Sequence, residues 1–438
     1  MGSYVPSTLE ERQKMLESIG CSSMEELFGM IPEGVLKYRP LDLPKGKSEL
    51  EVRRLMESIA DKNVVFKSIF RGAGAYNHYI PAVVKHVTSK EEFVTAYTPY
   101  QAEISQGILQ SIFEFQTMIC ELTGMDAANA SVYDGAVAAA EAAAMCRERR
   151  RTKTYISAAA HPDVIATVQT YCKAANTEAI VVPAKDGATD IDALASMLDD
   201  AAASVYLQQP NYYGVIEDAD AIGAVAHGAG AKLIMGVNPI AAAILKTPAD
   251  CGADIAVGEG QPLGMPLAFG GPYLGFMTCT SAMTRKLPGR IVGETVDVEG
   301  KRAYVLTLQA REQHIRREKA SSNICSNQAW CALTASVYMA AMGACGIAQA
   351  ARQSMDNAHY LACELGKIDG FERRYTRRFF HEFITECPVD VNLIMAKLEQ
   401  NGILGGYPVE GGILWCATEQ NSKQEIDRLV ALVKEAVQ

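Results

Sequence analysis

The sequence predicts an α/β fold with one large domain on a mostly parallel sheet, followed by a smaller C-terminal α+β domain. Short β-rich runs alternate with helical stretches between residues 127 and 280. Beyond Asn327 long helices and then mixed segments follow. Hydrophobic residues make up 49% of the 438 residues, enough for a large buried core. We therefore predict a helical arm at 1–70, the large domain at 71–327 and the smaller domain at 328–438.

The arm is predicted to consist of short helices joined by loops. Ser7 followed by Glu10, and Ser23 followed by Glu26, have the spacing of capping boxes at helix starts. Helices of this length cannot bury their apolar faces alone. We expect the arm to dock on the main body or on a second subunit.

The large domain is predicted to begin with a helix over 102–122, which Gly124 ends. Apolar residues recur along it at helical spacing, at Ile104, Ile108, Ile112, Phe115 and Ile119. Strands are predicted at 154–157, 179–182, 204–207, 232–235, 254–257 and 273–278. Helices between them are predicted at 136–149, 162–175, 191–198 and 218–228.

The smaller domain is predicted to open with long helices over 328–367. Strands near 379–385 and 412–417 and a last helix from Ser422 complete it. The sequence shows neither an internal repeat nor a low-complexity linker.

Charge and composition argue against several function classes. The net charge is −10 and the basic residues are scattered, so we expect no nucleic-acid partner and no membrane partner. The N-terminus lacks an apolar signal core, and the apolar region at 233–245 is interrupted by Asn238 and Pro239. We expect a cytoplasmic protein. Its twelve cysteines form no CxxC pair, so we expect no metal site.

The loops that follow the predicted strands are where a ligand should bind, beyond the carboxyl ends of the strands. The loop 129–137 opens an alanine-rich helix, whose free N–H groups can cradle an anion. A start capped by Asp134 explains the same pattern equally well. Two further loops of this kind lie at 236–239 and 258–264.

The order of these loops resembles fold-type I pyridoxal-phosphate enzymes, in which an Asp pairs with the cofactor's ring nitrogen and a Lys forms the Schiff base. Here Asn238 stands at the Asp position, and Glu259 and Gln261 occupy the region of the Lys. An amide supplies no anion, and neither Glu nor Gln can form an imine. Val137 also stands where a hydroxyl residue is expected beside the phosphate. We therefore predict a degenerate site with no directly bound cofactor and no catalytic residue in this chain.

Four longer motifs resemble the glycine cleavage system P-protein family. They are GAGAYNHYIP at 72–81, YTPYQAEISQG at 97–107, VGEGQPLG at 257–264 and REKASSNICSNQ at 317–328. Some members of that family are split into two chains, of which the N-terminal half lacks the cofactor lysine. The resemblance implies that half, the lysine-less subunit of a hetero-oligomeric glycine decarboxylase.

The same resemblance implies a reaction and its participants. A homologous lysine-bearing subunit would hold pyridoxal phosphate, on which glycine is decarboxylated. The aminomethyl group would then pass to the lipoyl arm of H-protein, with release of carbon dioxide. Two departures from the family pattern stand out: Val137 replaces a frequent threonine, and Asn77 a frequent aspartate.

One loop is predicted to reach the partner's pocket. Tyr97, Thr98, Tyr100 and Gln101 surround Pro99, which prevents a helix and exposes the side chains. A turn in which Thr98 or Gln101 caps the next helix is the alternative.

The glycine-rich loop 72–81 carries two further candidates, Tyr76 and His78. We assign these side chains a positioning role rather than proton transfer. Both this loop and 97–101 should be exposed in an isolated chain.

Three secondary hypotheses stay open. The chain could be an autonomous pyridoxal-phosphate enzyme with an unrecognised lysine, or a purely scaffolding or regulatory relative. A basic cluster of Arg311, Arg316, Arg317 and Lys319 is predicted to be a solvated or interface surface, with carrier-protein docking as a weaker alternative.

Overall fold

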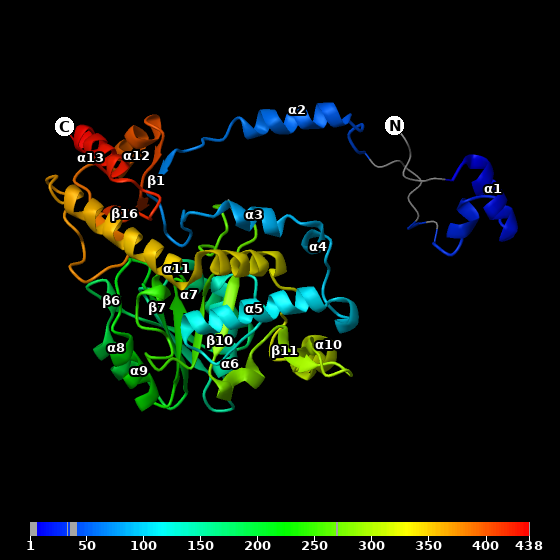
Figure 1. The fold of residues 1–438 in the computed structure, drawn as a ribbon, viewed down its shortest axis with the longest axis horizontal. Coiled ribbons are helices and arrows are strands. Elements are labelled where there is room, and N and C mark those ends of the chain that lie inside the picture. The colour runs from blue at the N-terminus through cyan, green and yellow to red at the C-terminus, as the bar shows by residue number, and fades with distance from the viewer. Residues whose placement is uncertain (1–6, 33, 36–41, 269, 438) are drawn as a thin grey trace. The chain divides into compact units, whose positions relative to one another are not determined.

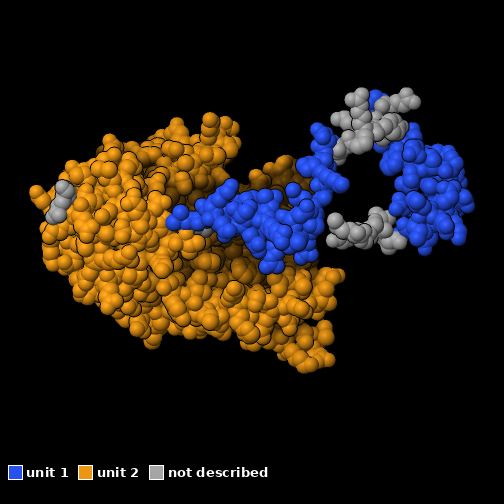
Figure 2. Space-filling view, turned by 90° about the horizontal axis from the view of Figure 1, so that it is seen from above, with its two compact units in different colours: residues 1–64 blue, residues 65–438 orange. Residues whose placement is uncertain are grey.

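The N-terminal unit contains short helices, as predicted. The computed structural model describes residues 7–32, 34–35, 42–268 and 270–437, and the chain forms two compact units, 1–64 and 65–438 (Figure 2). Unit 1 contains α1 (Leu9–Ser18), the 3₁₀ helix η1 (Glu25–Phe28) and α2 (Glu49–Ala60). The predicted domain boundaries at 70/71 and 327/328 stay predictions.

The capping residues of these helices differ from the prediction. Thr8, not Ser7, caps α1, and its capping box is completed by Glu11. The side chain of Ser23 does not cap η1. Instead Ser22 donates its backbone N–H to the carboxylate of Glu26 at 2.8 Å. Ser and Thr residues stand next to each other at these helix starts, so more than one of them has a Glu near the spacing of a capping box. The pattern therefore locates a helix start only to within one residue.

A seven-stranded sheet organises the second unit. Its strand order is β2-β10-β9-β8-β7-β3-β4, with β10 antiparallel to both neighbours and β9, β8, β7, β3 and β4 parallel. The strands are β2 (Ala127–Ala128), β3 (Lys153–Ser157), β4 (Ala179–Val182), β7 (Ala202–Gln209), β8 (Lys232–Val237), β9 (Ile255–Glu259) and β10 (Gly275–Cys279). Six of these strands were predicted, and their observed ends differ from the predicted ends by two residues or fewer.

Helices cover both faces of this sheet (Figure 1). Along β8, Leu233 and Met235 belong to one buried cluster and Ile234 to the other, because successive strand residues point to opposite faces. The first cluster includes α5 (Gln106–Thr123), α8 (Ile191–Met197), α9 (Ala219–Gly228) and α11 (Ala329–Leu365). The second includes α6 (Gly135–Cys146) and α7 (Pro162–Ala174).

The helix predicted over 102–122 is divided in two. A 3₁₀ turn, η2 (Ala102–Ile104), precedes α5, and Gly124 ends α5 with a left-handed φ of 71°. The hairpin of β11 (Ile291–Val296) and β12 (Arg302–Thr307) packs on α5, and Gln106 exchanges two hydrogen bonds with the backbone of Tyr304.

Several short helices and strands lie in the connections around the seven-stranded sheet. They are α3 (Ala82–Thr88), α4 (Glu91–Val94), β5 (Ala184–Lys185), β6 (Ala188–Thr189), η3 (Ala241–Ala243), η4 (Ser281–Lys286), η5 (Gln309–Arg311), α10 (Gln313–Arg316) and η6 (Arg317–Lys319).

Helix α11 links the sheet to the C-terminal layer. Its backbone is non-helical at Gly343, with φ 61°. Ala335 and Tyr338 before the break pack in the core against the sheet, and Ala358 and Leu361 after it pack in the C-terminal core. Among the described helices α11 alone is long and apolar enough to cross a membrane. Its two buried faces are those expected of a core helix.

The C-terminal layer carries an antiparallel sheet of order β13-β16-β15. Its elements are β13 (Glu382–Glu386), α12 (Val391–Gln400), β14 (Ile403–Leu404), β15 (Tyr407–Val409), β16 (Gly412–Cys416) and α13 (Lys423–Val437). β14 pairs with β1 (Ser68–Ile69), which lies far away in sequence. The loop 72–81 therefore starts from this layer.

Candidate functional site

A cavity of about 430 Å³ lies at the carboxyl ends of the parallel strands. The start of α6, the loop after β8 and the end of β9 contribute Gly135, Asn238 and Glu259 to its wall. The loop 72–81 and the start of β13 close it from the side of the C-terminal layer. This is where ligands bind in open α/β sheets.

The anion-binding start of α6 is filled by the chain's own carboxylate. Glu259 accepts hydrogen bonds from the backbone N–H groups of Gly135, Gln261 and Leu274, each at 3.0 Å. Burial raises the pKa of Glu259 to about 7, although these three N–H groups act to lower it. A Cβ added at Gly135 would be 2.8 Å from the backbone nitrogen of Glu259 and 2.9 Å from its Cβ, so only glycine fits at this position. The N–H groups of Gly135 and Val137 at the start of α6 are therefore already bound to carboxylates of this chain, and they are not free to bind a phosphate.

The side chains of Asp134 and Asn238 accept hydrogen bonds from nearby backbone N–H groups. Asp134 Oδ1 accepts from the N–H of Val137 at 2.8 Å, so the interpretation of a capped helix start is confirmed. Asn238 Oδ1 accepts from the N–H groups of Ile240 and Ala241 at 2.9 and 3.1 Å. The buried Nδ2 of Asn238 has no partner within the described part of the chain.

Gln261 fastens the loop 72–81 to the sheet. Its Oε1 accepts from the N–H of Tyr76 at 2.8 Å, while its Nε2 donates to the carbonyls of Tyr76 and Met265 at 2.9 and 2.8 Å. The position therefore forms a structural clamp. The described residues of the cavity wall include neither Lys nor Arg, so this chain's own site does not fit pyridoxal phosphate.

Tyr76 is held by a buried carboxylate that the sequence analysis did not single out. Its hydroxyl donates to Glu382 Oε2 at 2.7 Å, and Glu382 Oε1 accepts from the N–H of Ala73 at 2.7 Å. Burial raises the pKa of Glu382 to about 7. Burial, followed by the charge of Glu382, also raises the pKa of Tyr76 well above its ordinary value.

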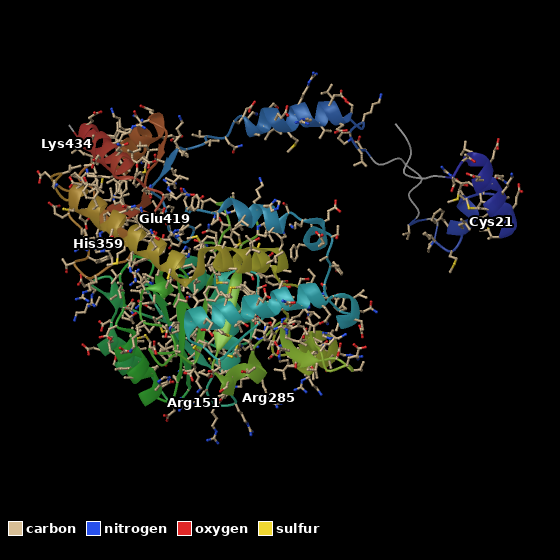
Figure 3. The ribbon with its side chains drawn as sticks, in the orientation of Figure 1. Cys21, Arg151, Arg285, His359, Glu419 and Lys434 are labelled. Carbon is tan, nitrogen blue, oxygen red and sulfur yellow. The ribbon has the colours of Figure 1, made fainter. Side chains whose placement is uncertain are left out.

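His78 belongs to another group of buried polar side chains, which lies next to Tyr76 and Glu382. His78 is 4% exposed, and its Nδ1 is 2.7 Å from Glu419 Oε2. Glu419, labelled in Figure 3, also accepts from the N–H of Tyr79 at 2.6 Å. The ring of His381 stacks 6.1 Å from that of His78, and neither of its nitrogens has a partner among the described residues. Burial, followed by the neighbouring His78, lowers the pKa of His381 well below its usual range.

The expectation that the loop 72–81 is exposed in the isolated chain was wrong except at Tyr79, because His78 is buried and the other residues are half-buried. Buried carboxylates of the C-terminal layer, Glu382 and Glu419, accept its N–H groups and the Tyr76 hydroxyl, which draws the loop inward. The sequence did contain one signal: the pair His381 and Glu382 stands in an otherwise apolar strand region that begins at Phe379.

In the loop 97–101, Tyr97, Tyr100 and Gln101 are exposed as expected, whereas Thr98 is half-buried and Pro99 is buried. Tyr97 and Tyr100 are 84% and 68% exposed. A short turn, with the N–H of Tyr100 donating to the Thr98 carbonyl at 2.8 Å, presents them to solvent. The guanidinium of Arg290 lies 5.8 Å from the centre of the Tyr100 ring. Gln101 precedes η2 but makes no side-chain capping bond, so the capping alternative is wrong for this residue.

The six candidate residues therefore fall into two places. Tyr76 lines the cavity and His78 lies in the adjoining buried cluster. None of Tyr97, Thr98, Tyr100 and Gln101 is part of the cavity wall. Of these, Tyr97, Tyr100 and Gln101 are exposed and Thr98 is half-buried, whereas Tyr76 and His78 form hydrogen bonds within the chain.

Similar solved structures establish the class of the fold. A crystal structure of a glycine decarboxylase, the P-protein of the glycine cleavage system in inhibitor-bound form, superposes with a TM-score of 0.93, 40% identity, and coverage of 99% of this chain and 100% of that one. An alanine–glyoxylate aminotransferase from Nostoc has a TM-score of 0.59 at 16% identity, covering 93% and 99%. The protein has the fold of the fold-type I pyridoxal-phosphate-dependent enzymes.

Sequence comparison narrows this class to one family. The family model described as glycine cleavage system P-protein matches residues 2–433. A probable glycine dehydrogenase (decarboxylating) subunit 1 from Desulfitobacterium hafniense is 48% identical, with 98% of both chains covered. Its counterpart from Moorella thermoacetica is 49% identical, with 98% and 99% covered. The chain belongs to the glycine cleavage system P-protein family.

Proposed function

We propose that this chain is the lysine-less subunit of a two-subunit glycine decarboxylase and that it completes the active site of a lysine-bearing partner. The observation that carries the proposal is the closed anion site at the start of α6. Because Glu259 takes the hydrogen bonds that a cofactor phosphate would need, the chain contributes through a neighbour. Pyridoxal phosphate is held by the partner, and the aminomethyl group passes to lipoylated H-protein.

The exposed loop 97–101 supports the same proposal. An isolated chain gains little stability from two tyrosines that are this exposed on a turn. At an interface, tyrosine supplies a large contact area and a hydroxyl that can hydrogen-bond substrate. We assign Tyr97, Thr98, Tyr100 and Gln101 to contacts with the partner's pocket. Tyr76 and His78 hold the wall of this chain's own cavity instead.

The positions of the lysines argue against an autonomous enzyme. Lys232 is at the amino end of β8, where it pairs with Asp254 at 2.8 Å. Lys246 pairs with Asp220 at 2.6 Å. Neither lysine lines the cavity. A Schiff-base lysine must reach the cofactor, so these positions do not support that alternative.

Reconstitution of the two-chain enzyme tests the proposal. Each chain is purified alone and both are co-expressed, and glycine-dependent exchange of carbon dioxide is assayed with lipoylated H-protein and pyridoxal phosphate. We expect activity only from the pair, together with a mass in solution greater than that of either chain. Full activity from the lysine-bearing chain alone, or no association at micromolar concentrations, would contradict the proposal. H-protein without its lipoyl group serves as the negative control.

A further inference from the structure

A second cavity, of about 230 Å³, lies along α6 and carries a strongly positive wall. Its positive side chains come from five places in the chain: Arg147, Arg285, Lys286, Arg311, Arg316 and Lys319. Arg285 is labelled in Figure 3. The sequence suggested a solvated or interface cluster at 311–319. The fold adds three cations from α6 and η4 to it, and Arg317 is not part of the wall.

Few carboxylates pair with these positively charged side chains. Lys286 is 3.7 Å from Glu148, and within residues 42–268 and 270–437 the other five form no ion pair. The whole chain carries a net charge of −10, so such a gathering is not a consequence of overall composition. Like charges brought into one concavity repel each other, and a bound anion relieves that repulsion.

Arg311 provides a second, independent observation. One of its terminal nitrogens donates to the Gly289 carbonyl at 2.7 Å, while its Nε is buried and has no partner among the described residues. Burial lowers the pKa of this guanidinium. A buried donor without an acceptor is rare and is a place to expect an external oxygen. The hydroxyl residues Ser321 and Ser322 lie on the same wall.

Among the described residues of this wall there is a single carboxyl group, and it does not cancel this charge. Glu141 is 3% exposed, and burial raises its pKa, although Ser322, Arg147 and Tyr171 act to lower it. Its environment therefore favours the neutral form more than that of an ordinary glutamate. The cavity is left with a large excess of positive charge.

We propose that this cavity binds a phosphate group. A phosphate carries close to two negative charges at neutral pH and several acceptor oxygens, which suits a wall of several cations and hydroxyls. Arginine forks bind such an oxyanion in a bidentate manner, and four of the six cations are arginines. The phosphate belongs either to a free phosphorylated metabolite or to the cofactor held by the partner subunit. The site is distinct from the start of α6, where Glu259 binds, and only the second of these two sources rests on the proposed function.

Titration with inorganic phosphate tests this site. Binding is measured by calorimetry at constant ionic strength for the full chain, for Arg316→Gln/Lys319→Gln and for the matched control Arg149→Gln/Arg150→Gln. Both double variants lose the same charge, but only the first pair lines the cavity. We expect saturable binding at one site, weakened at least about tenfold in the first variant and less than about twofold in the control. Circular dichroism verifies that both variants fold.

Three results would overturn the proposal. They are the absence of saturable binding to the wild-type chain, equal weakening by both double variants, and tighter binding of succinate than of phosphate. The source of the phosphate is decided with the assembled enzyme. If phosphate binds equally well before and after saturation with pyridoxal phosphate, the ligand is a free metabolite. If the cofactor competes with it, the cavity holds the cofactor's phosphate.

Discussion

The carboxylate of Glu259 stands where an external anion would bind, and this single side chain has a direct chemical consequence. Glu259 accepts the N–H of Gly135 at the start of α6, and the described residues of the cavity wall include neither Lys nor Arg. We expect the isolated chain, incubated with the cofactor and reduced with borohydride, to show no stoichiometrically modified lysine on peptide mapping. The lysine-bearing partner serves as the positive control. Full labelling of one lysine would support the autonomous-enzyme hypothesis instead.

Glu382 makes a second consequence measurable, through the pH dependence of stability. Its folded-state pKa of about 7 lies above the ordinary value of 4.5. The folded chain therefore holds the extra proton in this interval, and the free energy of unfolding falls as the pH rises from 4.5 to 7. Each pKa unit corresponds to about 1.4 kcal/mol, so a shift of this size corresponds to roughly 3 kcal/mol.

Glu382→Gln removes this titration and keeps both hydrogen bonds, because the amide can accept from the Ala73 N–H and donate to Tyr76. We expect the stability of the variant, measured by urea unfolding, to fall less than that of the wild type between about pH 5 and pH 8. In the control Glu386→Gln, the replaced group has a pKa lowered by its hydrogen bond to Arg374, so its titration lies below this interval. Identical slopes for Glu382→Gln and the wild type would show that Glu382 is ionised throughout.

Among the elements, the turn at 97–101 combines exposure with polar chemistry. If its side chains contact substrate or the lipoyl arm in the partner's pocket, Tyr97→Phe, Tyr100→Phe or Gln101→Ala should each lower glycine turnover by the assembled enzyme. The loss of one polar contact to a transition state costs about 2–4 kcal/mol, or roughly 30- to 1,000-fold in rate. Assembly and melting temperature should not change, since these side chains are exposed.

Tyr407→Phe is a matched control, because Tyr407 is a partly exposed tyrosine in β15, outside this turn. Equal turnover in all three loop variants and in the control would favour the scaffolding hypothesis. A lower melting temperature in the loop variants would instead indicate a structural role within the chain.

The sheet could be predicted closely, because its strands are short apolar runs between turn residues. The six predicted strands were found, and β4 (Ala179–Val182) had the predicted ends. Helix ends were less accurate, since the choice of cap depends on a single hydroxyl at Thr8 rather than Ser7. The sequence predicted long helices over 328–367 but not the position of the break at Gly343, because one glycine in an apolar helical stretch does not identify a kink.

The sequence predicted which residues lie at the site, but not which hydrogen bonds they form. The sequence identified Asn238, Glu259 and Gln261 as substitutions at cofactor positions. It could not show that the Glu259 carboxylate turns back to the start of α6 or that Gln261 clamps the loop at Tyr76. Such contacts join residues more than 100 positions apart, and no local pattern encodes them.

The arrangement of the chain in two compact units bears on assembly. Residues 65–438 contain the large hydrophobic clusters, whereas unit 1 is small and helical. Helix α2 places Val52, Leu55, Met56 and Ile59 on one face and buries no residue. A helix of this length gains little stability by itself. An exposed apolar face on a short helix is typical of a segment that is buried against a partner subunit.

The last prediction concerns this face of α2. If it packs on the lysine-bearing subunit, it belongs to an obligate interface, which buries on the order of 2,000 Å² or more and is apolar at its centre. Leu55→Gln/Ile59→Gln should then raise the dissociation constant of the pair at least about tenfold, because two apolar side chains would be lost from a buried contact. The control Arg53→Gln/Glu57→Gln removes an exposed ion pair of the same helix without changing the net charge. Association is measured by analytical ultracentrifugation, and the unfolding of each purified variant shows that residues 65–438 are intact. Equal association of both variants with the partner would mean that the arm is not part of the interface, and the contacts of the pair would then have to come from unit 2.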